Sequence, residues 1–209
     1  MNKAKFGLNA THLRILALTL MLLDHMWATV IPGNNWMTYV GRMAFPIFDF
    51  QAAEGYHHTH DFKGYCERLA IFALVSEIPF NLMIFSSPIF PFHQNVMLTL
   101  LLGLLACRAW DQRKWWKLAL LLLAGVVTFP DYGVMGVTTV LMFHVFRDWK
   151  WAQLLGLILI NWFGFEGQHL ILGSCEVPIQ AFAIGAILPI LLYNGEKGKG
   201  GKALQYGSY

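Results

Sequence analysis

Residues 11–31 of the chain read THLRILALTLMLLDHMWATVI. A helix needs roughly 20 apolar residues to cross about 30 Å of membrane hydrocarbon, and this stretch has that length. It lacks the small-residue cleavage site of a signal peptide. Similar apolar runs, broken by short polar turns, continue through most of the chain. We therefore expect an all-α, polytopic membrane protein with about eight transmembrane helices.

Eight apolar runs in the sequence are long enough, or nearly so, to cross a membrane. They are Thr11–Ile31, Trp36–Tyr56, Tyr65–Phe85, His93–Trp110, Lys117–Phe129, Gly133–Phe146, Trp151–Phe165 and Val177–Asn194. The fifth and sixth runs are short and meet at Phe129-Pro130-Asp131-Tyr132-Gly133. They form either two thin spans or one re-entrant pair, and both possibilities stay open.

The composition agrees with this fold class. The 209 residues are 56% hydrophobic and 13% charged, whereas a soluble globular chain is about 45–50% apolar and about 25% charged. So few charges exclude a disordered chain and a nucleic-acid-binding module. The three cysteines make no disulfide framework of a secreted domain, and we interpret Cys66, Cys107 and Cys175 as packing residues.

The distribution of Lys and Arg predicts the orientation of the chain. With a cytoplasmic N-terminus and eight crossings, one side of the membrane receives 14 of the 15 basic residues. These are Lys3, Lys5, Arg14, Lys63, Arg68, Arg108, Arg113, Lys114, Lys117, Arg147, Lys150, Lys197, Lys199 and Lys202. The opposite connections 31–35, 86–92 and 166–176 contain none, so we expect the N-terminus in the cytoplasm.

The organisation expected along the chain is simple. Residues 1–195 form one transmembrane domain, because no linker or fixed-period repeat interrupts them. Residues 196–209 are rich in Gly, Lys, Gln and Tyr, and we expect them to be a basic cytoplasmic tail.

Several charged side chains fall inside the apolar runs. Arg42, the fifteenth basic residue, lies about six residues below the outer end of its run, where an unpaired charge costs about 3 kcal/mol or more. Asp24 and His25 lie at a similar depth in the first run, and Glu77 in the third. At about 1.5 Å per residue, all four share a layer about 10 Å below the outer surface. Four further residues enter this layer from the outer ends of later runs: His93, Asn95, Asp131 and Tyr132.

Two interpretations of this polar layer stay open. Asp24 and Arg42, together with Glu77, can form a structural ion pair between helices. Alternatively, a histidine beside a carboxylate in a buried layer is suited to proton transfer, which makes His25 a catalytic candidate. Adjacent helical positions point about 100° apart, so Asp24 does not simply orient His25. The orienting carboxylate is expected to be Glu77 or Asp131.

A second polar group lies near the inner ends of the first three runs. It comprises Arg14, His57, His58, His60, Lys63, Tyr65 and Arg68. One interpretation is that the basic residues are positive-inside anchors and that the histidines form a solvated loop. The other is a site for an anionic, phosphate-bearing cytoplasmic ligand. A zinc site is less favoured, because the loop offers no fourth ligand. Arg14 and His25 lie about 16 Å apart along one helix, a span that an extended acyl-CoA can bridge.

Short motifs follow one another along nearly the whole chain. They are Leu23-Asp24-His25, Gly41-Arg42-Met43-Ala44-Phe45-Pro46-Ile47-Phe48, Ala53-Glu54-Gly55-Tyr56, His58-Thr59, Tyr65, Arg68-Leu69, Glu77-Ile78-Pro79-Phe80-Asn81, Asn95-Val96, Asp131-Tyr132-Gly133-Val134-Met135-Gly136, Gln180 and Leu192-Tyr193-Asn194-Gly195. Each motif alone is weakly specific. The ordered series resembles the TraX family of conjugal-transfer membrane proteins.

The resemblance implies an N-acetyltransferase of the bacterial inner membrane that acetylates the N-terminal amine of F-type pilin, with acetyl-CoA as the donor. The family also looks related to larger transmembrane acyltransferases, including the acyltransferase-three and lysosomal glucosaminide acetyltransferase groups. In the former, a basic residue and a histidine separated by ten residues mark the first span, as Arg14 and His25 do here. By this analogy residues 1–195 are an acyltransferase-like domain, in which His25 is catalytic and Arg14 faces the CoA phosphates.

Two sets of site residues are therefore expected, and no metal site. The catalytic set is His25, Asp24, Arg42, Glu77, Asn95 and Asp131. The donor-binding set is Arg14, His58, Lys63, Tyr65, Arg68, Tyr193 and Asn194. In the family pattern, a further apolar span containing aromatic-Tyr-Pro-x-His follows Tyr-Asn-Gly, whereas this sequence reaches Gln205-Tyr206-Gly207-Ser208-Tyr209. Either this member lacks that helix, or the sequence is shortened.

The expected reaction is acetyl transfer to an amine, with His25 as general base and Asn95, Arg42 or Tyr132 donating to the oxyanion. An acetyl-histidine intermediate is the alternative route. A proton-coupled secondary transporter is the rival interpretation, because the same intramembrane acids and the proline-broken helices also suit proton relay. A non-catalytic membrane protein of pilus assembly is the third.

Overall fold

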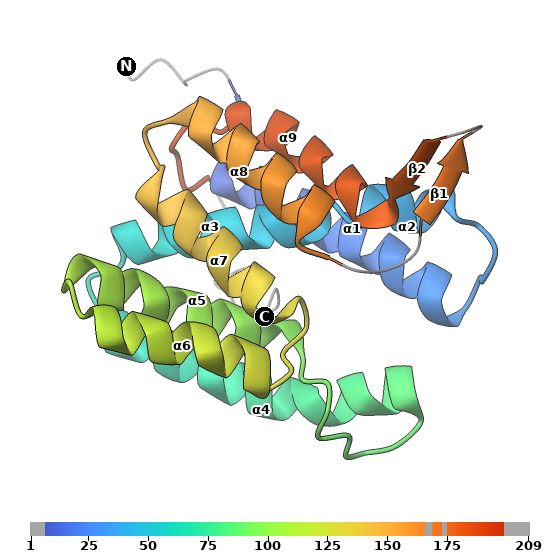
Figure 1. Ribbon diagram of the computed structural model, residues 1–209, viewed down its shortest axis with the longest axis horizontal. Helices are drawn as coiled ribbons and strands as arrows, with labels where there is room; N and C mark the ends of the chain where they lie inside the picture. The colour runs from blue at the N-terminus through green and yellow to red at the C-terminus, as the bar shows by residue number, and fades with distance from the viewer. Residues whose placement is uncertain (1–6, 166–168, 173–174, 199–209) are drawn as a thin grey trace. The chain divides into compact units, whose positions relative to one another are not determined.

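The computed structural model describes residues 7–165, 169–172 and 175–198 (Figure 1). Its elements are α1 (Ala10–Thr29), α2 (Trp36–Gly41), α3 (Ala44–His58), α4 (Phe62–Phe85), α5 (Val96–Asp111), α6 (Trp115–Val127), α7 (Gly133–Val145), α8 (Lys150–Phe163), β1 (His169–Leu172), β2 (Cys175–Pro178), the 3₁₀ helix η1 (Ile179–Ala186) and α9 (Ile187–Leu191). The described chain is mostly helical, which confirms the all-α prediction in outline. Predictions about Lys3, Lys5, Lys199, Lys202 and the tail from residue 199 lie outside the described residues.

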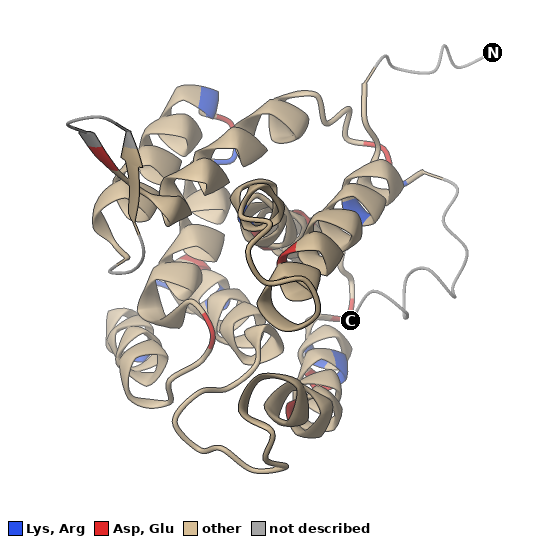
Figure 2. Cartoon of the chain, turned by 90° about the vertical axis from the view of Figure 1, so that its right-hand side faces the viewer, with Lys and Arg blue, Asp and Glu red and all other residues tan. Residues whose placement is uncertain are grey.

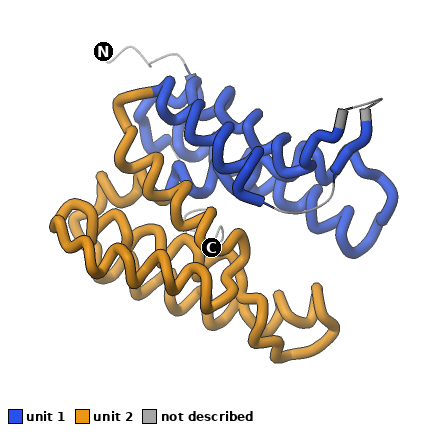
Figure 3. Tube along the Cα trace, in the orientation of Figure 1, with its two compact units in different colours: residues 1–51, 150–208 blue, residues 52–149, 209 orange. Residues whose placement is uncertain are grey.

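The chain divides into two compact units, coloured separately in Figure 3. Of the described residues, unit 1 contains those up to Gln51 and those from Lys150 onward, and unit 2 contains residues 52–149. The boundary falls inside α3, after Gln51. Figure 2 shows that long stretches of the helices carry no charged side chain. The few charges present therefore mark positions of interest.

Unit 1 is assembled from the two ends of the chain. Within it, α1 packs against α2, and η1 packs against α2, α8 and α9. The start of α1 pairs with the segment after α9, since Leu8 N–H donates to Leu192 O at 2.8 Å and Asn194 N–H donates to Leu8 O at 2.9 Å. Gln51 closes the same end, because its side-chain amide donates to Ala10 O at 2.7 Å.

Unit 2 is arranged around α5, which packs against α4, α6 and α7. The helices α5 and α7 approach closely at Gly103, where an added Cβ would lie 2.7 Å from Cβ of Val140. Gly125 has the same role on α6, since an added Cβ would lie 3.0 Å from Cα of Val134 on α7. Small residues let helices pack closely where apolar burial alone gives no preference between neighbours.

Helices occupy six of the eight predicted runs, with ends shifted by a few residues. The run Trp36–Tyr56 is wrong as a single helix, because the continuous α-helix is interrupted by a turn at Arg42 and Met43, between α2 and α3. Pro46 explains the break, since it has no N–H to donate to the carbonyl of Arg42, and it instead sits in the first turn of α3.

The run Val177–Asn194 is also wrong as a single helix. It begins in β2, which pairs antiparallel with β1, and continues as η1 and then α9. Pro178 and Pro189 each lack a backbone donor, and both interrupt the α-helical hydrogen-bond pattern that the apolar composition suggests. The hairpin β1–β2 lies in the predicted outer connection 166–176 and the start of this run.

Among the described helices, α4, with 24 residues, is the one long and apolar enough to cross a membrane. The helices α6 and α7 are apolar but have 13 residues each. At about 1.5 Å per residue they are about 20 Å long. The eight-crossing topology thus stays a prediction.

The close approach at Gly103 generates a test of the packing in unit 2. We expect Gly103→Ala to lower the thermal stability of the purified protein, because overpacking costs about 1–3 kcal/mol and the better helix propensity of Ala returns only about 1 kcal/mol. Adding Val140→Ala keeps Cβ of residue 140 but removes the two methyl carbons that would lie 2.8 and 3.0 Å from the added Cβ, and it should recover part of the loss in a double-mutant cycle. Equal melting temperatures for Gly103→Ala and the parent would contradict the packing described.

Candidate functional site

The Asp24 carboxylate is the centre of a polar cluster in unit 1. Asp24 Oδ1 accepts a hydrogen bond from the hydroxyl of Thr38 at 2.6 Å and lies 3.6 Å from Nη2 of Arg42. Arg42 also donates to the Thr38 hydroxyl from Nε at 3.3 Å and Nη2 at 3.2 Å. The contact between Asp24 and Arg42 expected from their depth is thus present. Gly41 permits it, because an added Cβ there would lie 2.6 Å from Cβ of Asp24.

His25 follows Asp24 on α1 but has a different partner. Its Nδ1 lies 2.8 Å from the carbonyl oxygen of Met21, one turn earlier. A carbonyl oxygen only accepts, so this contact assigns a proton to Nδ1, and in the neutral ring the lone pair is then on Nε2. The group that orients Nδ1 is therefore a backbone carbonyl, whereas we expected Glu77 or Asp131. Nε2 is the basic atom of this half-buried ring.

Arg14 and His25 share one unbroken helix, because α1 runs from Ala10 to Thr29. Eleven steps of about 100° return to within about 20° of the starting direction, and the rise is about 16 Å. Both side chains therefore lie on nearly the same face of α1. This face carries a cation near the N-terminal end of the helix and a basic nitrogen near its C-terminal end.

Glu77 and Asn95 form the centre of a polar cluster in unit 2. Glu77 Oε2 accepts from the side-chain amide of Asn95 at 2.6 Å and from its backbone N–H at 3.1 Å, and Oε1 accepts from Asn81 at 3.2 Å. Asn95 also donates to Ala73 O at 2.7 Å and caps α5 by accepting from Met97 N–H at 3.0 Å. The carboxylate thus stabilises the N-terminus of α5, and the donors of Asn95 are engaged within the unit.

Asp131 lies at the turn between α6 and α7. Its Oδ1 accepts from the backbone N–H of Tyr132 at 3.1 Å and lies 3.7 Å from Nε2 of His93. Its backbone carbonyl accepts from the Thr99 hydroxyl, and its N–H donates to Gln94 O at 2.7 Å. These bonds hold the turn against the start of α5. Tyr132 adopts the left-handed conformation, with φ 63°, and so reverses the chain direction into α7.

The structure thus gathers the predicted catalytic residues in two groups. Asp24, His25 and Arg42 belong to unit 1, and Glu77, Asn95 and Asp131 to unit 2. That both groups share one layer stays a prediction.

The predicted donor-binding residues also divide between the units. In unit 1, Tyr193 and Asn194 lie beside Leu8, at the end of α1 that carries Arg14. In unit 2, Lys63 is exposed and lies 3.6 Å from Glu67, whereas the Tyr65 side chain is buried against Gly55. His58 is exposed at the end of α3, and Arg68 is half-buried on α4.

Unit 2 also holds a histidine cluster that the sequence analysis missed. His144 Nε2 lies 2.8 Å from Asp111 Oδ1, and His144 Nδ1 lies 3.1 Å from Nε2 of His57. The hydroxyl of Tyr56 donates to Asp111 Oδ2 at 2.7 Å. The four side chains come from α3, α5 and α7. A buried His144, with both ring nitrogens engaged, links the ends of these helices.

An ion pair lies beside this histidine cluster. Arg147 Nε donates to Glu54 Oε1 at 2.8 Å. Burial lowers the pKa of His57, and the positive charge of Arg147 lowers it further. Partial burial raises the pKa of Asp111, but hydrogen bonds from Tyr56 and His144 outweigh this effect and leave the pKa below its ordinary value.

Comparison with known proteins now decides the family. The TraX protein family matches residues 9–209. The chain belongs to the TraX family. It is also similar to a protein of Dichelobacter nodosus named "Probable fimbrial assembly protein FimC, serogroup H1", with 26% identity over 210 residues that cover 91% of this chain and 86% of that protein. No solved structure matches the chain.

The motifs quoted for the TraX family include residues of the Asp24 cluster in unit 1 and of the polar groups at the end of α3 in unit 2. Leu23-Asp24-His25 and Gly41-Arg42 supply the acid, the histidine and the cation of unit 1. Ala53-Glu54-Gly55-Tyr56 supplies two members of the polar groups at the end of α3. Asp111 and His144 lie outside every quoted motif, and the depth argument, which considered each run by itself, gave no signal for them.

Two further observations concern ionisable groups of this TraX protein. Asp49 on α3 is fully buried, and neither carboxylate oxygen has a hydrogen-bond partner among the described residues. Among the described residues, no three His, Cys, Asp or Glu side chains are arranged to hold a metal ion.

The histidine cluster predicts a pH dependence of stability. The ordinary pKa of histidine is 6.5 and that of folded His57 is lower, so below pH 6.5 the unfolded chain binds more protons than the folded one. Thermal stability in detergent should therefore fall as the pH decreases from 7.5 to 5.5. The slope is below about 1.4 kcal/mol per pH unit, and solvent screening of the partly exposed ring reduces it further.

The variant His57→Gln should flatten this dependence, because it removes the group that takes up the proton. His60→Gln is the matched control, since His60 is an exposed histidine of the same loop. A slope that is the same in His57→Gln and in the parent protein would refute the assignment.

Proposed function

We propose that this TraX protein is a multi-pass N-acetyltransferase of the bacterial inner membrane, which transfers acetyl from cytoplasmic acetyl-CoA to an amine, with a pilin N-terminus as the acceptor. The observation that carries the proposal is the shared face of α1. It places Arg14 and the basic His25 about 16 Å apart. Membership of the TraX family supports the same reaction.

Two groups of contacts within unit 2 support the membrane placement. Glu77, Asn95 and Asp131 come from run ends that the Lys/Arg bias assigns to the outer side. His57, Asp111 and His144 come from run ends assigned to the cytoplasm, and they contact one another as well. Helices that cross in alternating directions produce both groupings.

Exposed apolar side chains give further support for the membrane. On α4, Leu74 is 76% exposed and Val75 is 65% exposed. On α6, exposed apolar residues include Leu120, Leu123 and Val126. Contiguous apolar surface of this kind marks a membrane or partner contact, and with α4 long enough to cross, we assign it to lipid.

In the proposed mechanism His25 moves the proton. Its Nε2 accepts the proton that the acceptor nitrogen loses as the C–N bond forms and the C–S bond of the thioester breaks. The same proton then passes to the departing sulfur, so that the products are an amide and a thiol. Arg42, in the same unit as His25, is the proposed donor to the oxyanion. Sequence and geometry leave direct transfer and an acetyl-histidine route as two forms of this mechanism.

Cations near the cytoplasmic ends of the helices are the proposed donor site. Arg14 binds a phosphate of the donor, because a guanidinium provides charge-assisted and bidentate hydrogen bonds. Tyr193 and Asn194 flank the same end of α1. His58, Lys63, Tyr65 and Arg68 are the proposed contributions of unit 2 to donor binding.

The acceptor proposal rests on the TraX family and on the relative from Dichelobacter nodosus, whose name describes fimbrial assembly. A pilin, as a small hydrophobic helical protein, can lie in the bilayer beside the enzyme. An amino sugar or a small amine is the alternative acceptor.

The buried Asp49 favours one rival function, a proton-coupled transporter. An acid inside a membrane helix with no partner among the described residues suits the uptake and release of a proton. Two measurements distinguish the transporter from the acetyltransferase. Substrate flux in liposomes free of CoA would support transport, and binding of acetyl-CoA by the purified protein would support the enzyme. A non-catalytic role in pilus assembly predicts that His25→Ala leaves function intact.

Acetyl transfer itself is the decisive measurement. Purified protein receives radiolabelled acetyl-CoA and a peptide with a pilin N-terminus. We expect His25→Ala to lower the transfer rate by about 10²–10⁴-fold, the contribution of a general base. Arg14→Ala should raise the KM for acetyl-CoA about tenfold or more, because it removes a charge-assisted hydrogen bond.

His169→Ala and Arg113→Ala are the matched controls, since both replace an exposed residue of the same type elsewhere in the chain. Both controls should keep the parent rate. Absence of acetyl-CoA binding by a well-folded parent protein would rule out the enzyme.

The proposed topology has its own test in cells. In a background without native cysteines, Ser87→Cys lies in an outer connection and Arg113→Cys in a cytoplasmic one. A membrane-impermeant maleimide should label Ser87→Cys in intact spheroplasts and Arg113→Cys only after permeabilisation. Labelling of both positions in intact spheroplasts would contradict the crossing of α5, the helix that separates them.

A further inference from the structure

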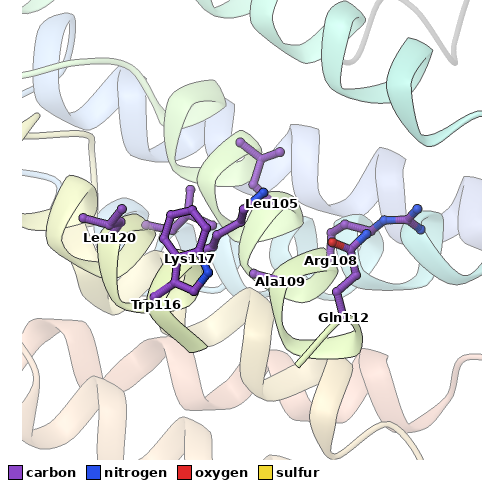
Figure 4. Close-up of a pocket in the computed structure, with 8 residues that line it drawn as sticks. Leu105, Arg108, Ala109, Gln112, Trp116, Lys117 and Leu120 are labelled. Atoms are coloured by element: carbon purple, nitrogen blue, oxygen red, sulfur yellow. The ribbon is translucent and has the colours of Figure 1, made fainter. Parts of the chain in front are cut away.

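A groove of about 350 Å³ lies between α5 and α6 in unit 2 (Figure 4). Its lining residues are Leu105, Arg108, Ala109, Gln112, Trp116, Lys117, Leu120 and Leu121. The lining divides by chemistry along the two helices. Leucines and the small Ala109 form an apolar channel, and the polar members gather toward the turn that joins the helices.

The turn end of the groove is cationic. Arg108 and Lys117 line the groove, and Arg113 and Lys114 lie in the turn between the helices. Lys117 Nζ lies 5.2 Å from the centroid of the Trp116 ring. Asp111, the last residue of α5, is the acidic residue beside this turn, and its carboxylate oxygens are bonded to Tyr56 and His144. The groove therefore presents positive charge and the amide of Gln112 at its polar end.

The apolar end of the groove opens on exposed surface. Leu120 is 55% exposed there, whereas Trp116, which is 63% exposed, lies at the turn end of the groove in the first turn of α6. Leu123 continues the same exposed face of α6 toward its C-terminus. A tryptophan beside lysines at the end of an apolar helix is typical of the membrane–water interface. An apolar channel of this kind, capped by cations, complements an amphiphile with an anionic head and a hydrocarbon chain.

We propose that this groove binds an anionic phospholipid of the cytoplasmic leaflet, with its phosphate at Lys117 and Gln112 and an acyl chain along Leu105 and Leu120. The inference rests on the proposed membrane placement. Basic pockets between helices on the cytoplasmic side recognise such headgroups. Arg108 adds positive charge at the same end, but its guanidinium carbon lies 5.3 Å from the ring centroid of Phe62, which is not a lining residue. Lys117 lies over Trp116, which does line the groove, so Lys117 is the proposed principal contact.

Native mass spectrometry of the full-length protein in detergent tests the proposal. Delipidated protein receives dioleoyl-phosphatidylglycerol or dioleoyl-phosphatidylcholine, which share their acyl chains and differ in net charge. A third sample receives glycerol 3-phosphate, which carries the phosphate without the chains. We expect one phosphatidylglycerol to be retained about tenfold more strongly than phosphatidylcholine, and no retention of glycerol 3-phosphate.

Two variants locate the bound lipid. Lys117→Gln should weaken phosphatidylglycerol binding about fivefold, the contribution of one cation near the membrane surface. Ala109→Leu should weaken both lipids by filling the channel. Lys114→Gln removes a cation from the same turn but not from the groove lining, and it should leave retention unchanged.

Several outcomes would overturn the proposal. Equal retention of the two phospholipids, or equal effects of Lys117→Gln and Lys114→Gln, would show that general surface charge attracts the lipid. Displacement of phosphatidylglycerol by equimolar acetyl-CoA would assign the groove to the donor. Loss of the parent protein from the membrane fraction in cells would refute the placement itself, independently of lipid binding in detergent.

Discussion

A charge in apolar surroundings is stable only with a partner, and this constraint organises the polar contacts of both units. Asp24 pairs with Arg42, and Glu54 pairs with Arg147. Glu77 instead takes neutral donors, chiefly Asn95. Each contact joins a residue of one helix to a residue at or near the end of another helix. In the proposed membrane setting, lipid and protein interior are equally apolar, and hydrophobic burial does not select one neighbour over another. The polar contacts and the close glycine approaches then determine which helices meet.

The sequence predicts the positions of helices well and their interruptions poorly. Apolar length alone locates α1 and α4, because hydrophobicity is a property of a whole run. The break between α2 and α3 depends on one missing donor at Pro46, and the β1–β2 hairpin depends on pairing between two short segments. Both are local backbone effects that an average over a run conceals.

Depth in a run predicts contacts in part. It identifies Asp24 and Arg42 correctly as partners because both lie near the same level. For Glu77 it places Asn95 in the same layer, and Asn95 is a partner. It gives no signal for Asn81, since level carries no information on the direction in which a side chain points. Asp111 and His144 were missed for a related reason. They lie 33 residues apart at the ends of different runs, and only the packing of α5 against α7 brings them together.

The hydrogen bonds of the histidines distinguish the candidates for a general base. A base needs a lone pair that can turn toward the substrate. Both ring nitrogens of His144 are engaged, one with His57 and one with Asp111, and the ring is buried, so its role is to connect helices. His57 donates Nε2–H to Nδ1 of His144, which leaves a lone pair on its own Nδ1, so hydrogen bonding excludes His144 but does not separate His57 from His25. Among the described contacts His25 uses Nδ1, on a carbonyl of its own helix. In the neutral ring that bond keeps the lone pair on Nε2, on the face of α1 that also carries Arg14. The proposal of His25 as the base thus follows from its tautomer as much as from its distance to Arg14.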